Sequence, residues 1–144
     1  RNLSAGSFAK RYGIAEGIPF PAATIEFSYK NDALEDPLLN TYHAVALGLC
    51  EQEEIETIKR YGFMINEELK RFWDKRGITL VDFKIEFGKD TAGRILLADE
   101  ISPDTCRLWD QKTGKKLDKD RFRHDLGGVE EAYGEVMKRA CGQV

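Results

Sequence analysis

The segment from residue 78 to residue 88 constrains the fold more than any other part of the chain. Within it, apolar and charged side chains alternate: Val81, Phe83, Ile85 and Phe87 against Asp82, Lys84 and Glu86. A β-strand places successive side chains on opposite faces, so this pattern predicts one face against a core and one charged face. Two carboxylates and an ammonium group on a rigid strand favour a site that holds a metal ion and anionic ligands.

A second predicted strand, 95–101, returns along the first one and predicts a hairpin. Directly opposite residues share a face, so the register decides where Asp99 points. If Gly88 pairs with Ile95, Asp99 joins the charged face of the first strand. If Gly88 pairs with Arg94, Asp99 points the other way unless a bulge intervenes. The sequence leaves both registers open.

Glu86 and Asp99 are the candidate metal ligands, one from each strand of the hairpin. Mg²⁺ takes carboxylate oxygens and commonly bridges to substrate phosphates. From the pattern alone, a surface ladder of ion pairs stays open as the alternative. Lys84 is either a salt-bridged strand lysine, which contributes little to stability, or a cation that offsets the charge of phosphates during catalysis.

The rest of the chain predicts an α+β fold, an antiparallel sheet with packed helices. The clearest helix spans 51–76, where acidic residues crowd the start and Gly77 ends it. Its apolar stripe recurs at intervals of three and four: Ile55, Ile58, Gly62, Ile65, Leu69 and Phe72. Other expected elements are a short helix over 7–12, a half-buried strand over 24–29, an irregular acidic loop over 30–37, a short helix or turn within 41–50, a basic turn over 111–119 and a helix over 129–140. The last helix is expected to bury Val129, Ala132, Tyr133, Val136, Met137 and Ala140.

The composition of the chain limits the classes of protein to which it can belong. The 144 residues are 42% hydrophobic, which suffices for one globular domain, expected over 1–144. A net charge of −3 with interspersed signs argues against nucleic-acid binding. No apolar run approaches the roughly 20 residues of a membrane span. The three cysteines are widely spaced and form no C-x-x-C pair: Cys50, Cys106 and Cys141. They predict free thiols in a reducing cytosol rather than a zinc site, and His43 and His124 are assigned to structure or surface.

Three motifs stand in a fixed order along the chain. Residues 80–88 read as an apolar pair followed by Asp-x-Lys-x-Glu-Phe-Gly, and residues 99–109 read as Asp-Glu-x-Ser-Pro-Asp-x-x-Arg-x-Trp. The chain opens with Arg-Asn-x-x-Ala-Gly-Ser at residues 1–7. Together with the segments 30–32 and 118–123, these motifs closely resemble the SAICAR synthetase family over nearly the whole chain.

The resemblance implies an ATP-dependent ligase of de novo purine biosynthesis. Such an enzyme joins L-aspartate to the carboxylate of carboxyaminoimidazole ribonucleotide through an acyl phosphate, releasing ADP and phosphate. Family members are longer and begin with a lobe that carries the ATP-binding segment, within a kinase-like or ATP-grasp-related fold. We therefore expect a C-terminal substrate-binding and catalytic lobe from a cytoplasmic enzyme, often a homo-oligomer. An inactive ribonucleotide-binding fragment is the alternative, and a kinase-like phosphotransferase is the least favoured one.

The resemblance also assigns roles to individual residues. Lys84, Glu86 and Asp99 match catalytic positions, with Glu86 and Asp99 as ligands of Mg²⁺. The phosphate and ribose would be held by Arg1, Ser7, Arg107 and Arg123. Further matches near the substrates are Lys30, Asp36, Ser102 and Asp104. On spacing alone, Arg107 and Arg123 are ordinary surface residues, and Ser4 or Ser7 is more readily an N-cap of the helix over 7–12 than part of an anion site at its start.

Overall fold

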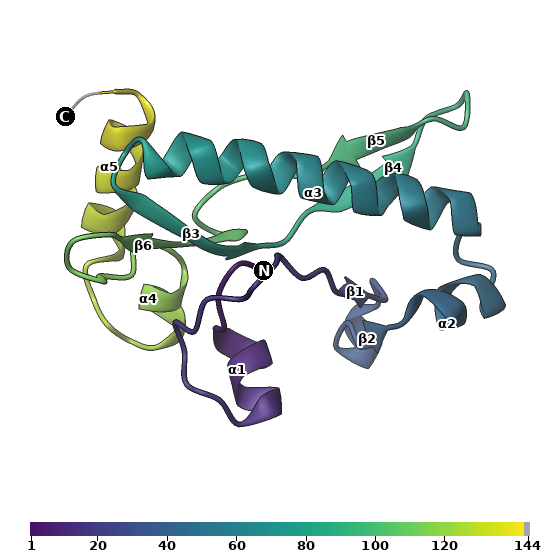
Figure 1. The fold of residues 1–144 in the computed structure, drawn as a ribbon, viewed down its shortest axis with the longest axis horizontal. Coiled ribbons are helices and arrows are strands. Elements are labelled where there is room, and N and C mark those ends of the chain that lie inside the picture. Colours follow the sequence, from purple (N-terminus) through teal and green to yellow (C-terminus); the bar gives the residue numbers. More distant parts are fainter. Residues whose placement is uncertain (143–144) are drawn as a thin grey trace.

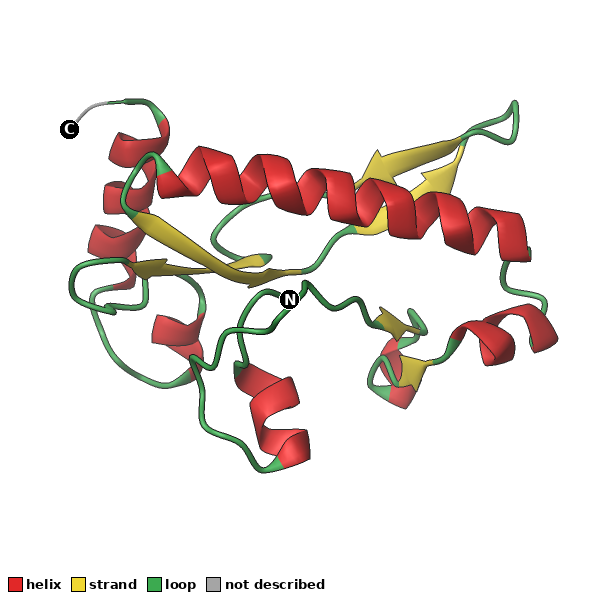
Figure 2. Ribbon diagram, in the orientation of Figure 1, coloured by secondary structure: helices red, strands yellow, loops and turns green. Residues whose placement is uncertain are grey.

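The computed structural model describes residues 1–142 and has the predicted α+β class (Figures 1 and 2). Within that range the strands form three separate two-stranded antiparallel sheets, β1–β2, β3–β6 and β4–β5, rather than one sheet. In chain order the elements are α1 (Gly6–Tyr12), β1 (Phe27–Ser28), η1 (Asp32–Leu34, a 3₁₀ helix), β2 (Leu38–Leu39), α2 (Thr41–Ala46), α3 (Gln52–Asp74), β3 (Ile78–Phe83), β4 (Glu86–Lys89), β5 (Ile95–Ala98), β6 (Cys106–Asp110), α4 (Asp120–Arg123) and α5 (Val129–Ala140).

Helix α3 runs along the long axis of the molecule, and β3 passes beside it (Figure 1). A capping box between Glu51 and Glu54 satisfies free backbone N–H groups at its start, so the predicted helix over 51–76 is confirmed. The expected apolar stripe is wrong at its last position. Phe72 is 37% exposed and lies under the Arg76 guanidinium, whereas the neighbouring Trp73 is buried.

The hydrophobic core lies between the C-terminal half of α3, the sheet β3–β6 and α5. Its buried members are Trp73, Ile78, Leu80, Cys106, Leu108, Leu117, Ala132 and Val136. Helix α5 forms as predicted, but Met137 is 66% exposed instead of buried. The helix contacts the sheet through one stripe four residues apart, from Ala132 through Val136 to Ala140, and Met137 lies about 100° around the helix from that stripe.

The segment predicted as a single strand over 78–88 is divided between two sheets. Strand β3 pairs with β6, which the sequence analysis did not predict, and β4 pairs with β5. Lys84 and Ile85 lie between β3 and β4 and belong to neither strand. The predicted hairpin is therefore confirmed only for its outer part, 86–98, and the first half of the segment serves the core sheet.

A bulge in β3 changes which face each of its side chains occupies. Leu80 pairs with Leu108 and Asp82 with Arg107, so Val81 has no partner on β6. The carbonyl of Val81 instead accepts hydrogen bonds from the backbone N–H groups of residues 2 and 3, at 2.8 and 3.2 Å. Asp82, expected on the charged face opposite the core, is nevertheless only 4% exposed.

The hairpin register is neither of the two considered from the sequence. Gly88 pairs with Leu96, which places Ala98 opposite Glu86 at the end of the ladder. Asp99 follows with a φ of 65°, in the left-handed region that non-glycine residues rarely adopt. Its direction is therefore set by this local turn rather than by the alternation of a strand.

The N-terminal third differs from prediction in its details. Helix α1 forms and ends at the left-handed Gly13, as expected. Its N-cap residue is Ala5, so neither serine caps it; the fully buried Ser4 hydroxyl donates to the Ala15 carbonyl at 2.7 Å instead. The strand expected over 24–29 is reduced to the two residues of β1, and the loop over 30–37 contains η1.

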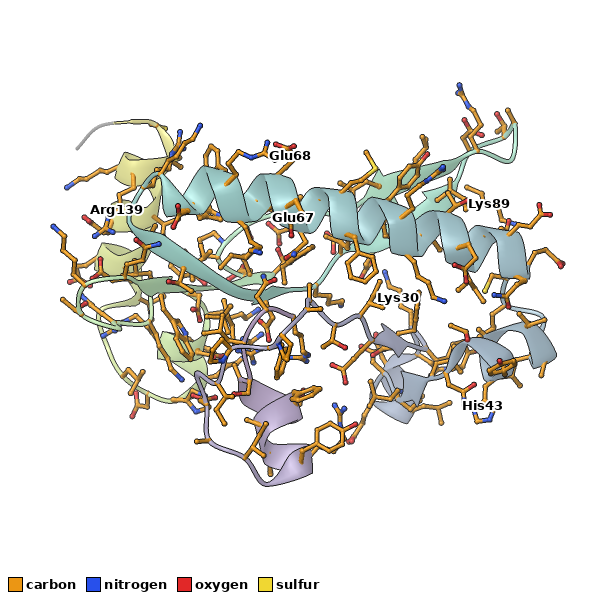
Figure 3. All side chains as sticks on the ribbon, in the orientation of Figure 1. Lys30, His43, Glu67, Glu68, Lys89 and Arg139 are labelled. Atoms are coloured by element: carbon orange, nitrogen blue, oxygen red, sulfur yellow. The ribbon has the colours of Figure 1, made fainter. Side chains whose placement is uncertain are left out.

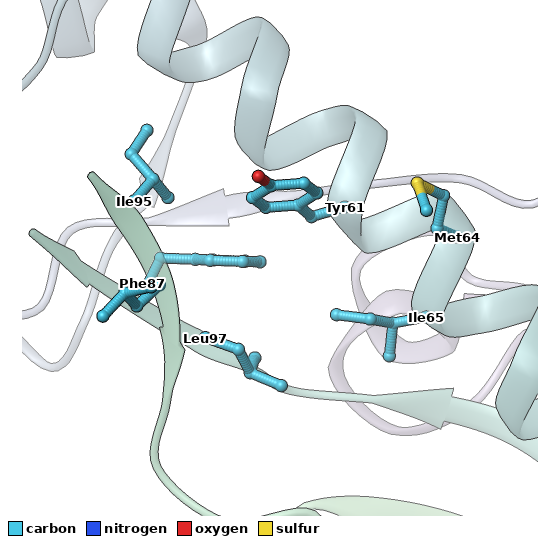
Figure 4. A pocket seen from close by; sticks show the side chains of 7 residues that line it. Tyr61, Met64, Ile65, Phe87, Ile95 and Leu97 are labelled. Carbon is cyan, nitrogen blue, oxygen red and sulfur yellow. The ribbon is translucent and has the colours of Figure 1, made fainter.

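An apolar groove of about 280 Å³ lies between α3 and the hairpin β4–β5 (Figure 4). It is lined by Tyr61, Met64, Ile65, Phe87, Ile95, Leu96 and Leu97. The rings of Tyr61 and Phe87 stack across it with 6.3 Å between their centroids. This contact joins the hairpin to the helix. None of the helices within residues 1–142 is long and apolar enough to span a membrane.

Candidate ligand-binding cleft

A cleft of about 990 Å³ lies among the N-terminal segment, α3 and the β3–β4 connection. Nine of the predicted site residues line it: Arg1, Ser7, Lys30, Asp36, Lys84, Glu86, Asp104, Arg107 and Arg123. Asp99 and Ser102 are not among its lining residues. The structure thus brings together side chains that are more than one hundred positions apart in the sequence.

One end of the cleft, hereafter the arginine end, is lined by Arg1, Arg107, Arg123 and Asp82, and the buried carboxylate of Asp120 supports it from outside the lining. Asp82 accepts hydrogen bonds from Arg1 and from Nη1 of Arg107, the latter at 2.9 and 3.1 Å to its two oxygens. The bulge at Val81 supplies this arrangement, because it turns the Asp82 side chain inward and docks the N-terminal residues on the same strand. A buried carboxylate is stable only with such partners.

The second carboxylate of the arginine end, Asp120, bridges two arginines. One oxygen accepts Nε of Arg107 at 2.7 Å, and the other accepts Nη1 of Arg123 at 2.9 Å. Burial opposes ionisation of this carboxyl, but the hydrogen bonds from both arginines outweigh it and lower the pKa of Asp120. Asp118 holds the turn by accepting the backbone N–H groups of Leu108 and Asp120, each at 2.8 Å.

Gly6 allows the N-terminal segment to approach the arginine end closely. A Cβ atom built on Gly6 would lie 2.2 Å from Nη2 of Arg107, and Gly6 has a φ of 52°. Both observations require glycine at this position. Glu26 adds a further anchor, since its carboxylate accepts Nε of Arg1 at 2.5 Å and Nη1 of Arg11 at 2.6 Å. The Ser7 hydroxyl lies 3.4 Å from Arg1 Nη2.

The other end of the cleft, hereafter the lysine end, contains Lys30, Lys84 and Glu86. Nζ of Lys30 lies 2.5 Å from Glu86 Oε2, and Nζ of Lys84 lies 3.2 Å from Oε1. The hydrogen bond from Lys30, followed by that from Lys84, lowers the pKa of Glu86. The side chains of Lys30 and Lys84 are 76% and 66% exposed. Figure 3 shows Lys30 between β1 and α3.

Asp99 belongs to the lysine end by electrostatics rather than by contact. Its carboxylate contributes, after the larger effect of Glu86, to raising the pKa of Lys30. Within residues 1–142, no group of three or more His, Cys, Asp or Glu side chains is placed to hold a metal ion. The lysine end therefore offers a metal ion two carboxylates at most, those of Glu86 and Asp99. Both carboxylates lie near positively charged lysines.

Apolar side chains also line the cleft. They are Ile25, Phe27, Ile58, Phe63, Phe83, Ile85 and Phe87. Gly62 keeps this wall open, because an added Cβ would lie 3.3 Å from the Ile25 side chain. Apolar walls with a few convergent polar groups are typical of small-molecule sites.

The remaining predicted site residues make contacts that hold the structure around the cleft. Asp104 accepts the hydroxyl of Tyr133 on α5 at 2.5 Å, and burial together with Asp104 raises the pKa of Tyr133. The Ser102 hydroxyl accepts the backbone N–H of Asp104 at 3.1 Å, which shapes this turn from outside the cleft. Asp36 accepts the backbone N–H of Asn31 at 2.8 Å and so holds its own loop.

The cysteines and histidines take no part in this arrangement. Burial raises the pKa of Cys106 to about 11, so its thiol stays protonated at neutral pH although it lines the cleft. All three cysteines are free. His43 lies exposed at the edge of the molecule on α2 (Figure 3), and His124 is exposed as well, as expected.

Sequence reasoning missed the side chains that hold the predicted site residues in place. Asp82 was placed on the charged strand face without a role of its own, while Asp120 and Tyr133 were given no part in the site. The spacing of Asp120 and Arg123 was a usable signal, because residues three apart on a helical turn form ion pairs. For Asp82 the signal is absent, since its burial depends on a bulge that alternation does not reveal.

Comparison with known proteins gives a consistent result. A family model described as SAICAR synthetase matches residues 1–140. A phosphoribosylaminoimidazole-succinocarboxamide synthase from Clostridium botulinum is 60% identical over 139 residues, covering 96% of this chain and 59% of the relative. A solved structure described as SAICAR synthetase (Type-2) in complex with ADP superposes with a TM-score of 0.95 at 53% identity, over 99% of this chain and 60% of the other. The crystal structure of phosphoribosylaminoimidazole-succinocarboxamide synthase from Ehrlichia chaffeensis superposes with a TM-score of 0.94 at 50% identity, over 97% of this chain and 60% of the other.

Proposed function

The chain belongs to the SAICAR synthetase family, and on that premise we propose that its cleft binds carboxyaminoimidazole ribonucleotide for ligation to L-aspartate. The chain spans about 60% of the length of the relatives it matches. The proposal therefore assigns it the substrate-binding and catalytic lobe of an ATP-dependent carbon–nitrogen ligase of purine biosynthesis. Turnover would need the nucleotide-binding part that the longer relatives include.

The observation that carries this proposal is the group of three arginines at the arginine end. Arg1 and Arg107 share the buried carboxylate of Asp82, and Arg107 and Arg123 share that of Asp120. All three line the cleft. Guanidinium groups bind phosphate through paired N–H donors, so this end suits the phosphate of a ribonucleotide. Ser7 adds a hydroxyl beside Arg1, and the apolar walls suit a flat heterocycle.

In this proposal the lysine end serves the reaction itself. ATP would transfer its terminal phosphoryl group to the substrate carboxylate, giving an acyl phosphate and ADP. The amine of L-aspartate would then attack the acyl carbon, forming the C–N bond as phosphate leaves and the amine loses a proton. Lys30 and Lys84 would offset the negative charge of the phosphoryl group. Lys30, Asp36, Ser102 and Asp104 remain predicted contributors to substrate binding.

Glu86 and Asp99 are the residues that would hold Mg²⁺ in this site. Mg²⁺ in phosphoryl-transfer sites commonly takes one or two carboxylates, with phosphate and water as its other ligands, and the two acids of the lysine end fit that donor set. When bound, the ion would neutralise charge on the phosphates. The solved relative in complex with ADP supports a nucleotide in the proposed reaction.

Calorimetric titration with carboxyaminoimidazole ribonucleotide, with and without Mg²⁺, tests the binding part of the proposal. We expect saturable binding by the wild-type chain and its loss in Arg107→Ala. The matched control is Arg94→Ala, because Arg94 pairs with Asp90 in the hairpin loop and does not line the cleft. Absence of binding by the folded wild-type chain, or equal binding by Arg107→Ala, would refute the assignment of the pocket.

Assays that supply the part of the relatives that this chain does not match test the ligase reaction. A chimera with the remaining part of a relative should form product from ATP, L-aspartate and the ribonucleotide. Lys84→Ala in that chimera should lower kcat by roughly a hundredfold while changing KM for the ribonucleotide only a little. A raised KM with an unchanged kcat would instead make Lys84 a binding residue.

A second candidate is an inactive fragment that binds the ribonucleotide without turning it over. The partial coverage of the relatives favours it for the chain alone. Ribonucleotide binding without product formation, even in the chimera, would establish it. The proposal also includes a cytoplasmic location, supported by three free thiols, and a homo-oligomer, which light scattering of the chimera would check.

A further inference from the structure

Asp120 lies outside the cleft but contacts two of the arginines that line it. Its side chain is fully buried, whereas the side chains of Arg107 and Arg123 are 18% and 45% exposed. Resting on the function proposed above, we propose that Asp120 is a positioning residue. It holds the guanidinium groups of Arg107 and Arg123 at a fixed spacing, so that together they receive one phosphate group of the substrate.

The hydrogen bonds divide the arginine nitrogen atoms into held and free ones. Arg107 donates Nε to Asp120 and Nη1 to Asp82, which leaves Nη2 for a ligand. Arg123 donates Nη1 to Asp120, which leaves Nε and Nη2. These free N–H groups have no partner among the described residues. Because one carboxylate receives both arginines, the two guanidinium groups cannot move apart independently.

Asp118 fixes the backbone position of Asp120. The carboxylate of Asp118 accepts the backbone N–H of Asp120 with one oxygen and that of Leu108 with the other. This ties the start of α4 to the core strand β6. The geometry of the two arginines is thereby coupled to the hydrophobic core rather than to a mobile loop.

Charge alone would predict the opposite effect of Asp120 on phosphate binding. A carboxylate beside an anion site reduces its positive potential, so neutralising Asp120 should strengthen phosphate binding if only charge mattered. A positioning residue acts through order: it prevents two like-charged guanidinium groups from separating and lowers the entropy lost when the ligand binds. Neutralising it should then weaken binding. The sign of the effect distinguishes the two roles.

The decisive variant is Asp120→Asn, titrated with ribose 5-phosphate and with carboxyaminoimidazole ribonucleotide. We expect roughly tenfold weaker binding of both ligands, corresponding to one charge-assisted hydrogen bond no longer held in place. The matched control is Asp110→Asn, which removes a buried carboxylate that also pairs with an arginine, Arg139, but away from the cleft. The control should keep wild-type affinity. Unchanged or tighter binding by Asp120→Asn would overturn the inference.

A measurement on the ligand-free wild-type chain keeps the inference testable if Asp120→Asn does not fold. Nuclear magnetic resonance of the arginine side chains should show slow guanidinium rotation for Arg107 and Arg123, which Asp120 holds. Rotation should be fast for Arg60, which lies over the Tyr61 ring and has no carboxylate partner within residues 1–142. Fast rotation of Arg123 would overturn the inference. Slow rotation in a wild-type chain that binds neither ligand would overturn the proposed function, and with it the role of Asp120 in binding.

Discussion

The two ends of the cleft are built in different ways. At the arginine end, the carboxylates Asp82 and Asp120 are 6% and 0% exposed at the side chain, and each receives two arginines. At the lysine end, Glu86 is 20% exposed and its partners are lysines that extend into solvent. The arginine end has its geometry before any ligand arrives, whereas the lysine end can rearrange around one.

The difference follows from what supports each end. The arginine end rests on β3, β6 and the turn before α4, all of which contact the main core. At the lysine end, Glu86 lies on the two-stranded hairpin β4–β5, whose apolar side chains Leu96 and Leu97 are 49% and 43% exposed, and both lysines lie in connecting segments. In our proposal this division suits a ligase. The rigid end would provide affinity for the part of the substrate that does not react, and the adaptable end would accommodate phosphoryl transfer.

The largest expected difference concerns stability after removal of one carboxylate from each end. Asp82→Ala removes the buried carboxylate that Arg1 and Arg107 share, while Glu26 and Asp120 still pair with them, and it should lower the free energy of unfolding by about 3 kcal/mol. Glu86→Ala should cost less than about 1 kcal/mol, because its lysines remain solvated. Urea unfolding of both variants measures the contrast. Equal losses would show that the lysine end is as structural as the arginine end.

A smaller, pH-dependent effect on stability is expected at Asp110. This residue lies on β6, in the same sheet as Asp82, but does not line the cleft. Hydrogen bonds from the Thr113 hydroxyl and N–H, with a further one from Arg139, lower the pKa of Asp110 to about 2, from 3.8. A lowered pKa in the folded state means that the stabilisation is present above pH 3.8 and is lost as the pH falls toward 2. It amounts to roughly 2 kcal/mol.

Acid unfolding of Asp110→Asn tests this expectation. The variant should be less stable than the wild type at pH 7, and the gap should close as the pH falls below 3.8. Ribonucleotide affinity at pH 7 should stay unchanged, which separates the stability of the sheet from the geometry of the arginine end. A gap that persists at pH 2 would mean that Asp110 contributes through packing rather than through its charge.

Local patterns predicted the helices well and the sheets poorly. Helix α3 has acidic residues at its start, an apolar stripe that holds as far as Leu69 and a glycine after its end, and each is visible in the sequence. The division of 78–88 between two sheets is not visible, because alternation is the same whichever strand a segment pairs with. Strand β6 was missed since its partner, β3, precedes it by 23 residues and a whole hairpin lies between them.

The candidate site shows the same difference between what local patterns predict and what tertiary structure decides. Motifs placed nine candidate residues around one cleft, and their roles remain predictions that the binding and turnover experiments test. The residues that support them, Asp82 and Asp120, depend on a bulge and on a turn held by Asp118, which are tertiary features. A motif can identify the groups that face a ligand more easily than the groups that hold them.

The smallest expected effect tests whether the hairpin belongs to the main core at all. Leu97→Ala removes a side chain that is already 43% exposed, so it should cost about 1 kcal/mol or less. Leu108→Ala, its counterpart at the fully buried centre of β6, should cost about 2–5 kcal/mol. Hydrogen exchange should agree, with amides of β4–β5 opening at lower free energy than those of β3–β6. If Leu97→Ala were as costly as Leu108→Ala, the hairpin would unfold only together with the core. The lysine end could not then rearrange independently of the arginine end, and the proposed division between a rigid and an adaptable end would fail.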